Sequence, residues 1–339
     1  MKIVCKQSPY YDYLTATIIE GLQELGHEII ASENSNYATK NPDIKVKKAM
    51  ESADLIIVFS NYDVRRYLVE DIKNPMIVYV DGSDSQDFSI PSNILFKAVF
   101  KRELHKFWEP IPNNLIFPMP FAIERRYINR SEKARDIPVS FAATLGTNTV
   151  RYSAYHALKA LKIEGAWIGG TGERAYVGKG DSKGVPAPTG KYRNILERSM
   201  ISINSIGGGY DCARYWEILA SGAMLLTQDI EIQMPNSLVD GQHCVVFRNS
   251  EELVEKLNYY KSRPDEVDRI SQAGSAYALS HHTTAKRAEY FLEKICFART
   301  SDSFADYFFH GDEFPSSKIK WYLKKYTRTY YQRLIEGLS

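Results

Sequence analysis

Residues 202–227 read SINSIGGGYDCARYWEILASGAMLLT, and the interpretation of the whole chain starts from this stretch. It predicts the end of a buried strand, a glycine-rich turn, a short amphipathic helix from about Ala213, and a second apolar strand. Gly222 is expected to end the helix, because glycine readily adopts the left-handed conformation that follows many helices. A strand, a helix and a strand in this order indicate a parallel α/β unit.

The turn and the start of the helix carry residue types that bind phosphate. Gly207, Gly208 and Gly209 let the backbone approach a ligand closely, and the helix start offers unpaired N–H groups and a positive dipole end. Arg214 lies in the first helical turn, and Glu217 follows three residues later on the same face. We expect Arg214 to clamp a diphosphate and Glu217 to accept hydrogen bonds from a ribose. The alternative is a flexible turn followed by a surface ion pair worth about 0.3 kcal/mol.

The run from Glu217 to Thr227, together with Pro235 and residues 238–247, resembles the carboxyl-terminal half of GT-B glycosyltransferases. The R-x-x-E-x-L-A-x-G pattern from Arg214 to Gly222 is similar, more narrowly, to the group 1 glycosyltransferases related to the spore-maturation protein CgeB. The resemblance covers residues 139–294, whereas the amino-terminal half matches mainly in layout. It implies two facing Rossmann-like domains with a cleft between them, the donor on the second and the acceptor on the first.

The resemblance also implies a donor pocket on the second domain. We expect its residues to be Asn204, Gly207, Gly208, Gly209, Tyr210, Asp211, Arg214 and Glu217, with Thr147 and Arg151 from an earlier strand–helix loop. That loop could equally be an ordinary connection capped by Thr147 or Asn148. Many relatives carry an acidic residue eight positions before the ribose-binding glutamate, but here that position is Gly209, with Asp211 displaced by two residues. The departure leaves retention and inversion both open.

The first domain supplies candidates for proton transfer. An inverting transferase needs a group that takes the proton of the acceptor hydroxyl. Asp81, at the end of a predicted buried strand, and Asp12, in the first strand–helix loop, are the candidates in that order. An aspartate before a glycine is also a common turn or capping residue, which is the alternative for Asp81. The run from Phe100 to Glu103 is similar to one in the same group, with a solvated helix start as its alternative.

Strands alternate with helices along both halves of the chain, which predicts doubly wound parallel α/β domains. A charged stretch at 123–136 reads as a linker, so we predict an acceptor-side domain at 1–130 and a nucleotide-sugar-binding domain at 131–300. Residues 169–191 are rich in glycine and lack periodicity, which is typical of a lid or binding loop. The tail at 301–339 mixes aromatic and basic residues. It predicts a helix that packs back on the first domain or lies on an anionic membrane.

Composition narrows the class of protein. The chain has 339 residues, 44% of them hydrophobic and 25% charged, as in a globular protein, and a net charge of +2 gives no drive toward nucleic acid. Its four cysteines and seven histidines show no metal-ligand spacing, so we expect no metal site and no obligatory cofactor. No apolar run is long enough to span a membrane, and no signal peptide follows the first predicted strand. We therefore expect a cytoplasmic protein, with the tail as its contact to a membrane surface.

Together these patterns favour a metal-independent glycosyltransferase of polysaccharide biosynthesis. Its donor would be a nucleotide sugar, with a UDP-sugar slightly favoured, and its acceptor a hydroxyl of a glycan, a lipid-linked molecule or another compound. Two alternatives remain open. One is a sugar-nucleotide epimerase of the same fold, which needs no acceptor groove. The other is a non-catalytic nucleotide-sugar-binding protein that keeps the cleft but lacks a competent base.

Overall fold

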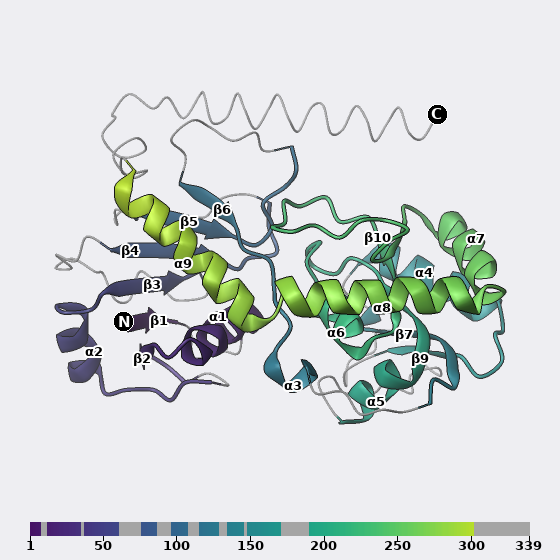
Figure 1. The fold of residues 1–339 in the computed structure, drawn as a ribbon, viewed down its shortest axis with the longest axis horizontal. Helices are drawn as coiled ribbons and strands as arrows, with labels where there is room; N and C mark the ends of the chain where they lie inside the picture. Colours follow the sequence, from purple (N-terminus) through teal and green to yellow (C-terminus); the bar gives the residue numbers. More distant parts are fainter. Residues whose placement is uncertain are drawn as a thin grey trace.

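The computed structural model describes residues 1–7, 12–34, 37–60, 76–86, 96–107, 115–128, 134–145, 148–170 and 190–301. In this part of the chain, two sheets lie side by side, and helices flank them (Figure 1). The first sheet has six strands in the order β2-β1-β3-β4-β5-β6, and the second has five in the order β11-β10-β9-β7-β8. Neighbouring strands within both sheets are parallel, which confirms the predicted pair of α/β units.

The first sheet is formed by the amino-terminal part of the chain. Its strands are β1 (Lys2–Lys6), β2 (Glu28–Ala31), β3 (Leu55–Phe59), β4 (Ile77–Asp81), β5 (Ala98–Lys101) and β6 (Ile116–Pro118), and its first helices are α1 (Tyr13–Glu24) and α2 (Asp43–Met50). Strands β3, β4 and β5 are buried along their whole length, as expected of strands covered on both faces. Asp12 begins α1, because its carboxylate accepts a hydrogen bond from the Thr15 N–H at 2.8 Å.

The second sheet contains β7 (Ile137–Ala143), β8 (Trp167–Gly170), β9 (Ser199–Asn204), β10 (Met224–Gln228) and β11 (Val245–Phe247). The short α3 (Arg125–Ile128) precedes it, and its helices are α4 (Thr149–Ala160), α5 (Gly190–Arg198), α6 (Ala213–Ser221), α7 (Ser250–Lys261) and α8 (Pro264–His281). As predicted, α6 ends at Gly222, whose φ of +76° is left-handed. The chain runs from β7 to β8 on one side and then to β9 on the other, so the carboxyl ends of β7 and β9 form a topological switch point, where such sheets bind ligands.

The last described helix, α9 (Thr284–Thr300), returns to the first sheet. Figure 1 shows α8 along the second sheet and α9 continuing across the first. The ring of Phe291 in α9 contacts that of Phe100 in β5, with centroids 4.4 Å apart, and α9 also packs on α1. The chain therefore crosses back within the range 131–300 that the sequence assigns to the second domain. The predicted domain division stays a prediction. Residues 302–339 and most of the predicted loop at 169–191 lie outside the described residues.

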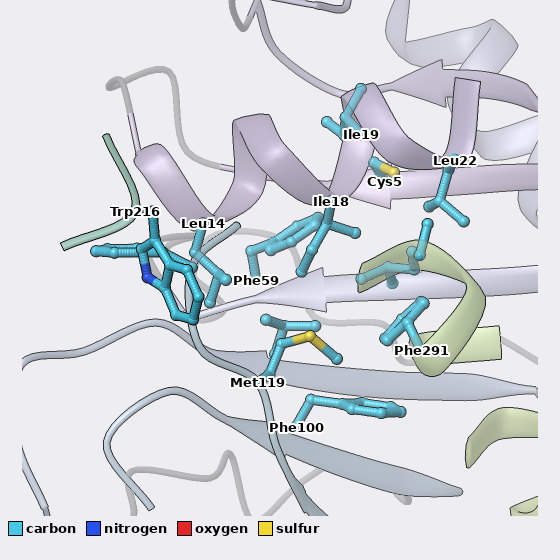
Figure 2. Packing of buried hydrophobic residues seen from close by; sticks show 14 of the residues in the cluster. Cys5, Leu14, Ile18, Ile19, Leu22, Phe59, Phe100, Met119, Trp216 and Phe291 are labelled. Atoms are coloured by element: carbon cyan, nitrogen blue, oxygen red, sulfur yellow. The ribbon is translucent and has the colours of Figure 1, made fainter. Parts of the chain in front are cut away.

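A continuous hydrophobic cluster connects the two sheets (Figure 2). It includes Leu14 and Ile18 of α1, Phe59 of β3 and the fully buried Trp216 of α6. A second cluster around Phe141 belongs to the second sheet alone. Since the first cluster draws on both sheets, apolar burial itself holds α6 against the first sheet. None of the described helices combines the length and the apolar composition that crossing a membrane requires.

Candidate functional site

The glycine-rich turn follows β9 at the switch point of the second sheet. Its glycines at 207, 208 and 209 are not among the residues with positive φ, so backbone conformation does not explain them. The lack of space for a side chain explains them instead. A Cβ on Gly207 would lie 2.6 Å from Arg151 Nη2, and Cβ atoms on Gly208 and Gly209 would clash with the carboxylates of Asp84 and Glu103, respectively. Side chains from both sheets therefore approach the turn closely, and the predicted approach of a ligand to these glycines stays a prediction.

Two arginines lie beside the turn. Arg151 of α4 donates through Nη1 to the Thr144 carbonyl at 3.0 Å and through Nη2 to the Ser205 carbonyl at 3.1 Å. It thereby joins the loops that follow β7 and β9. Burial, and after it the positive charge of Arg214, lower the pKa of Arg151 to about 10. Nε and Nη1 of Arg214 are buried and have no hydrogen-bond partner among the residues that the structure describes. The two guanidinium groups thus place positive charges next to each other beside the glycine-rich turn.

The loop before α4 contains the predicted helix cap, whereas its role in binding a diphosphate stays a prediction. Asn148 caps α4, since its Oδ1 accepts a hydrogen bond from the Val150 N–H at 2.8 Å. Its amide also donates to the Gly207 carbonyl at 3.1 Å, so the same residue positions the glycine-rich turn. Thr147, the other predicted member of this loop, lies outside the described residues.

Glu217 is buried in the second turn of α6. Its Oε2 accepts a hydrogen bond from the Tyr192 hydroxyl at 2.7 Å, and Tyr127 also hydrogen-bonds to it. Glu217 and Arg214 form no ion pair with each other in the described structure, so the interpretation as a surface pair is wrong. The carboxylate is bound by two hydroxyl groups, which are the groups that a ribose would offer. Its role in binding a ribose stays a prediction.

Asn204 and Asp211 make their contacts within the protein. Asn204 is fully buried and donates from Nδ2 to Thr227 Oγ1 at 3.1 Å, between β9 and β10. Asp211 accepts hydrogen bonds from Trp216 Nε1 at 2.9 Å and from the Phe121 N–H at 2.5 Å. Asp211 thus links the glycine-rich turn to the chain that leaves the first sheet. The predicted donor contacts of these two residues remain predictions.

The two predicted bases meet at the carboxyl edge of the first sheet, but in different environments. Asp81 is fully buried, and its Oδ2 lies 2.9 Å from Lys101 Nζ. Its Oδ1 accepts hydrogen bonds from Ser83, from the N–H at 3.0 Å and from Oγ at 2.7 Å. Asp12 lies close to Gly82 and keeps part of its surface exposed. Asp81 is thus buried whereas Asp12 is partly exposed, and the catalytic role of each stays a prediction.

The residues at the carboxyl end of β5 matter more than the sequence suggested. Lys101, Arg102 and Glu103 are all buried, so the alternative of a solvated helix start is wrong. Three consecutive charged residues at the end of an apolar strand were the available signal, because a strand end of this kind faces the ligand-binding edge. Among the described residues, no group of three or more histidine, cysteine, aspartate or glutamate side chains is arranged to hold a metal ion.

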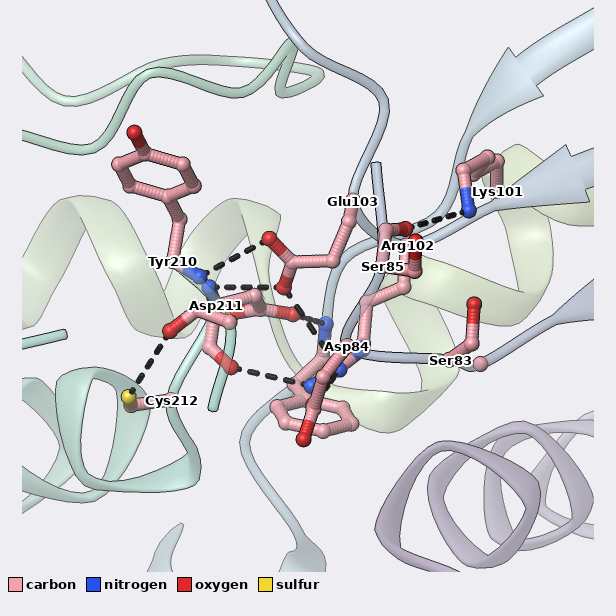
Figure 3. A network of polar contacts seen from close by, with 12 residues as sticks. Ser83, Asp84, Ser85, Lys101, Arg102, Glu103, Tyr210, Asp211 and Cys212 are labelled. Atoms are coloured by element: carbon pink, nitrogen blue, oxygen red, sulfur yellow. Dashed lines mark hydrogen bonds and ion pairs between the residues drawn. The ribbon is translucent and has the colours of Figure 1, made fainter. Parts of the chain in front are cut away.

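Figure 3 shows how these residues meet the glycine-rich turn. The Glu103 carboxylate accepts hydrogen bonds from the N–H groups of Tyr210 at 2.9 Å and Asp211 at 3.1 Å. Arg102 donates to the Asp211 carbonyl at 3.1 Å and forms an ion pair with Asp84. Burial raises the pKa of Glu103 to about 7, although Arg102 acts in the opposite direction. Both sheets therefore contribute charged groups to one site.

The fold is that of GT-B glycosyltransferases. The chain is similar to HepE from Anabaena in complex with UDP-glucose, with a TM-score of 0.62 and 11% identity over 87% of this chain and 99% of that one. The chain is also similar to a glycosyltransferase from Rickettsia africae ESF-5, with a TM-score of 0.61 and 13% identity over 89% of this chain and 99% of that one. For an alpha-glucosyltransferase in complex with UDP and a 13-mer DNA, the TM-score is 0.62 and the identity 12%, over 87% of this chain and 99% of that one. At such identities the likeness shows the fold.

Residues 151–293 match the family described as "Glycosyl transferase-like", so this part of the chain is a glycosyl transferase-like domain. The matched range includes Arg151, the glycine-rich turn, Arg214 and Glu217. The fold and the domain confirm the glycosyltransferase resemblance read from the sequence. The chain matches no curated protein sequence.

Proposed function

We propose that the protein is a glycosyltransferase that moves a sugar from a nucleotide-sugar donor to a hydroxyl group of a glycan or lipid-linked acceptor. The GT-B fold and the glycosyl transferase-like domain support this class of reaction. A UDP-sugar is the proposed donor, because HepE and the alpha-glucosyltransferase are described in complexes with UDP-glucose. We place the reaction in the cytoplasm, in polysaccharide synthesis, without an obligatory metal ion.

The arginine pair at the start of α6 carries the proposal. When the sugar is transferred, negative charge grows on the departing diphosphate, and prearranged cations and N–H groups stabilise it. Arg151 and Arg214 are neighbours, and two buried nitrogens of Arg214 lack a partner among the described residues. The N-cap residue of α6, Cys212, makes no capping hydrogen bond with its side chain, and in this proposal the first N–H groups of the helix add to the same anion site.

On the acceptor side, we propose Asp12 as the base of an inverting reaction. Asp12 is a partly exposed residue, and its carboxylate, whose Oδ2 accepts hydrogen bonds from Thr15, lies beside Gly82 at the edge of the first sheet. Asp81 is the less suitable base, because Lys101 and Ser83 engage both of its oxygens. We assign Asp81 the role of holding the loop after β4 in place.

A thermal-shift screen against UDP, GDP, TDP, CDP and CMP tests the donor site. UDP should raise the unfolding temperature most, since a ligand at a hundred times its Kd adds about 2.7 kcal/mol of stability. Release of UDP from UDP-sugars, with and without an added hydroxyl acceptor, then tests for turnover. Binding without turnover under any condition would favour the non-catalytic alternative.

Arg214→Lys tests the carrying observation directly. Lysine keeps the charge but lacks the planar two-pronged donor, so UDP binding should weaken by about 1.5–3 kcal/mol. Arg263→Lys is the matched control, because Arg263 stacks on Tyr259 where α7 meets α8. Equal UDP affinity in Arg214→Lys and the wild type would show that Arg214 does not bind the diphosphate.

A further inference from the structure

We propose that Glu103 is a positioning residue of the transferase. Its carboxylate reaches across from the first sheet and holds the glycine-rich turn, and with it the start of α6, in the geometry that the donor requires. The catalytic consequence rests on the proposed function, whereas the contact itself does not depend on it.

The contact joins parts of the chain that are far apart in sequence. Glu103 follows β5, and its two oxygens each accept an N–H from consecutive residues of the turn, at 2.9 Å from Tyr210 and 3.1 Å from Asp211. Cys212, the next residue, is the N-cap of α6, and Arg214 lies in the first turn of that helix. The Glu103 side chain has no exposed surface, so water does not compete for these bonds. A shift of Glu103 would therefore be transmitted to the arginine site within a few residues.

The absence of a side chain at Gly209 leaves room for the Glu103 carboxylate to reach the turn. A Cβ at this position would lie no more than 3.0 Å from either oxygen of the Glu103 carboxylate. The acidic group beside the turn comes from the first sheet, and the missing side chain at position 209 leaves room for it. The position of the Glu103 carboxylate therefore depends on a glycine at position 209.

Charged groups surround Glu103 from both sheets. Arg102 lies on the first-sheet side, with Nη2 at 3.6 Å from Glu103 Oε1, and Asp84 pairs with Arg102. Asp211 and Cys212 face it from the turn. Burial and Asp211 raise the pKa of Glu103, Arg102 and the two N–H bonds lower it, and the result is about 7. The ionised group accepts both N–H bonds, whereas a protonated group must also place its own O–H, so the hold on the turn weakens below about pH 7.

The Glu103→Gln variant tests the proposal in the full-length protein. We expect kcat with a UDP-sugar to fall about 10–100-fold, as when a reacting group is misplaced by about 1 Å, with a much smaller change in KM. The wild-type rate should decline as the pH falls through about 7, and this step should be absent in the variant. Hydrogen exchange at the amides of Tyr210 and Asp211 should be faster in the variant, because their acceptor is weakened. Glu289→Gln, in an exposed pair with Lys286 on α9, is the matched control.

Gly209→Ala approaches the same contact from the other sheet and leaves the charge of Glu103 unchanged. It should lower kcat and speed exchange at Tyr210 and Asp211, because its Cβ displaces the carboxylate. In a Glu103→Ala background, Gly209→Ala should lower kcat little further, since the carboxylate with which its Cβ clashes is absent. This variant also serves if Glu103→Gln fails to fold.

The outcomes separate this inference from the proposed function. Wild-type kcat, pH profile and amide exchange in Glu103→Gln would overturn the inference, and so would a lowered unfolding temperature with unchanged kcat. A wild-type protein that neither binds UDP nor releases it from UDP-sugars would overturn the proposed function. In that case the amide exchange of Tyr210 and Asp211 would still decide whether Glu103 holds the turn.

Discussion

Replacing Asp81 by asparagine separates a structural role of this residue from the catalytic role that its position in the sequence suggests. Asp81 Oδ2 lies 2.9 Å from Lys101 Nζ, and neither side chain has exposed surface. Lys101 also donates to the Ser85 carbonyl at 2.8 Å. Asparagine has nearly the same shape and can keep the hydrogen bonds from Ser83 to Oδ1. What it removes is the negative charge that compensates Lys101.

We expect Asp81→Asn to lower the free energy of unfolding by about 3–5 kcal/mol, the usual effect of leaving one charge of a buried pair without its partner. Adding Lys101→Met should recover most of this loss, because apolar or neutral replacements of a whole buried pair are often as stable as the pair. Glu289→Gln removes one partner of an exposed pair, so it should change stability by only about 0.2–1 kcal/mol.

Urea-induced unfolding of the single variants and the double variant gives the three free energies, and UDP release gives the activity of each at a temperature where it is folded. A structural role predicts that stability and activity fall together in Asp81→Asn and return together in the double variant. The reasoning is refuted if Asp81→Asn is as stable as the wild type while its kcat falls by about 10²–10⁴, the range for a lost general base. Asp81 would then be the base after all.

Two further variants test the remaining site residues. Glu217→Gln keeps an acceptor for Tyr192 but loses the charge, so calorimetry should show UDP affinity reduced by about 1.5–3 kcal/mol; unchanged affinity would leave Glu217 as a buried partner of the tyrosine. Asp12→Asn preserves the cap of α1, because asparagine caps helices well, but it should cut kcat by about 10²–10⁴ while UDP affinity stays constant. A near-normal rate in Asp12→Asn would exclude it as the base, and NMR of the product anomer would then show whether the enzyme retains or inverts.

Local pattern was enough to predict the parallel α/β units and the central helix. The sequence alone places that helix from about Ala213 to Gly222, and α6 spans Ala213–Ser221. Apolar periodicity and a glycine cap act within one or two turns of the chain, so no tertiary information was needed. The prediction that Arg151 and Arg214 lie at one site has a related reason. Each lies in a helix that follows a strand of the same parallel sheet, and the carboxyl ends of parallel strands lie at the same edge of the sheet.

The tertiary structure alone decided which groups meet across the sheets. Glu103 and the Tyr210 N–H are 107 positions apart in the sequence, yet they are hydrogen-bonded. The sequence offers Asp81 as a candidate base or a turn aspartate, but β4 and β5 are neighbours, and their pairing places Lys101 beside it. The return of α9 to the first sheet likewise depends on the apolar surface that α1 and β5 leave to be covered. Such contacts follow from strand order and from the packing of one sheet against the other, and neither leaves a periodic signal in the local sequence.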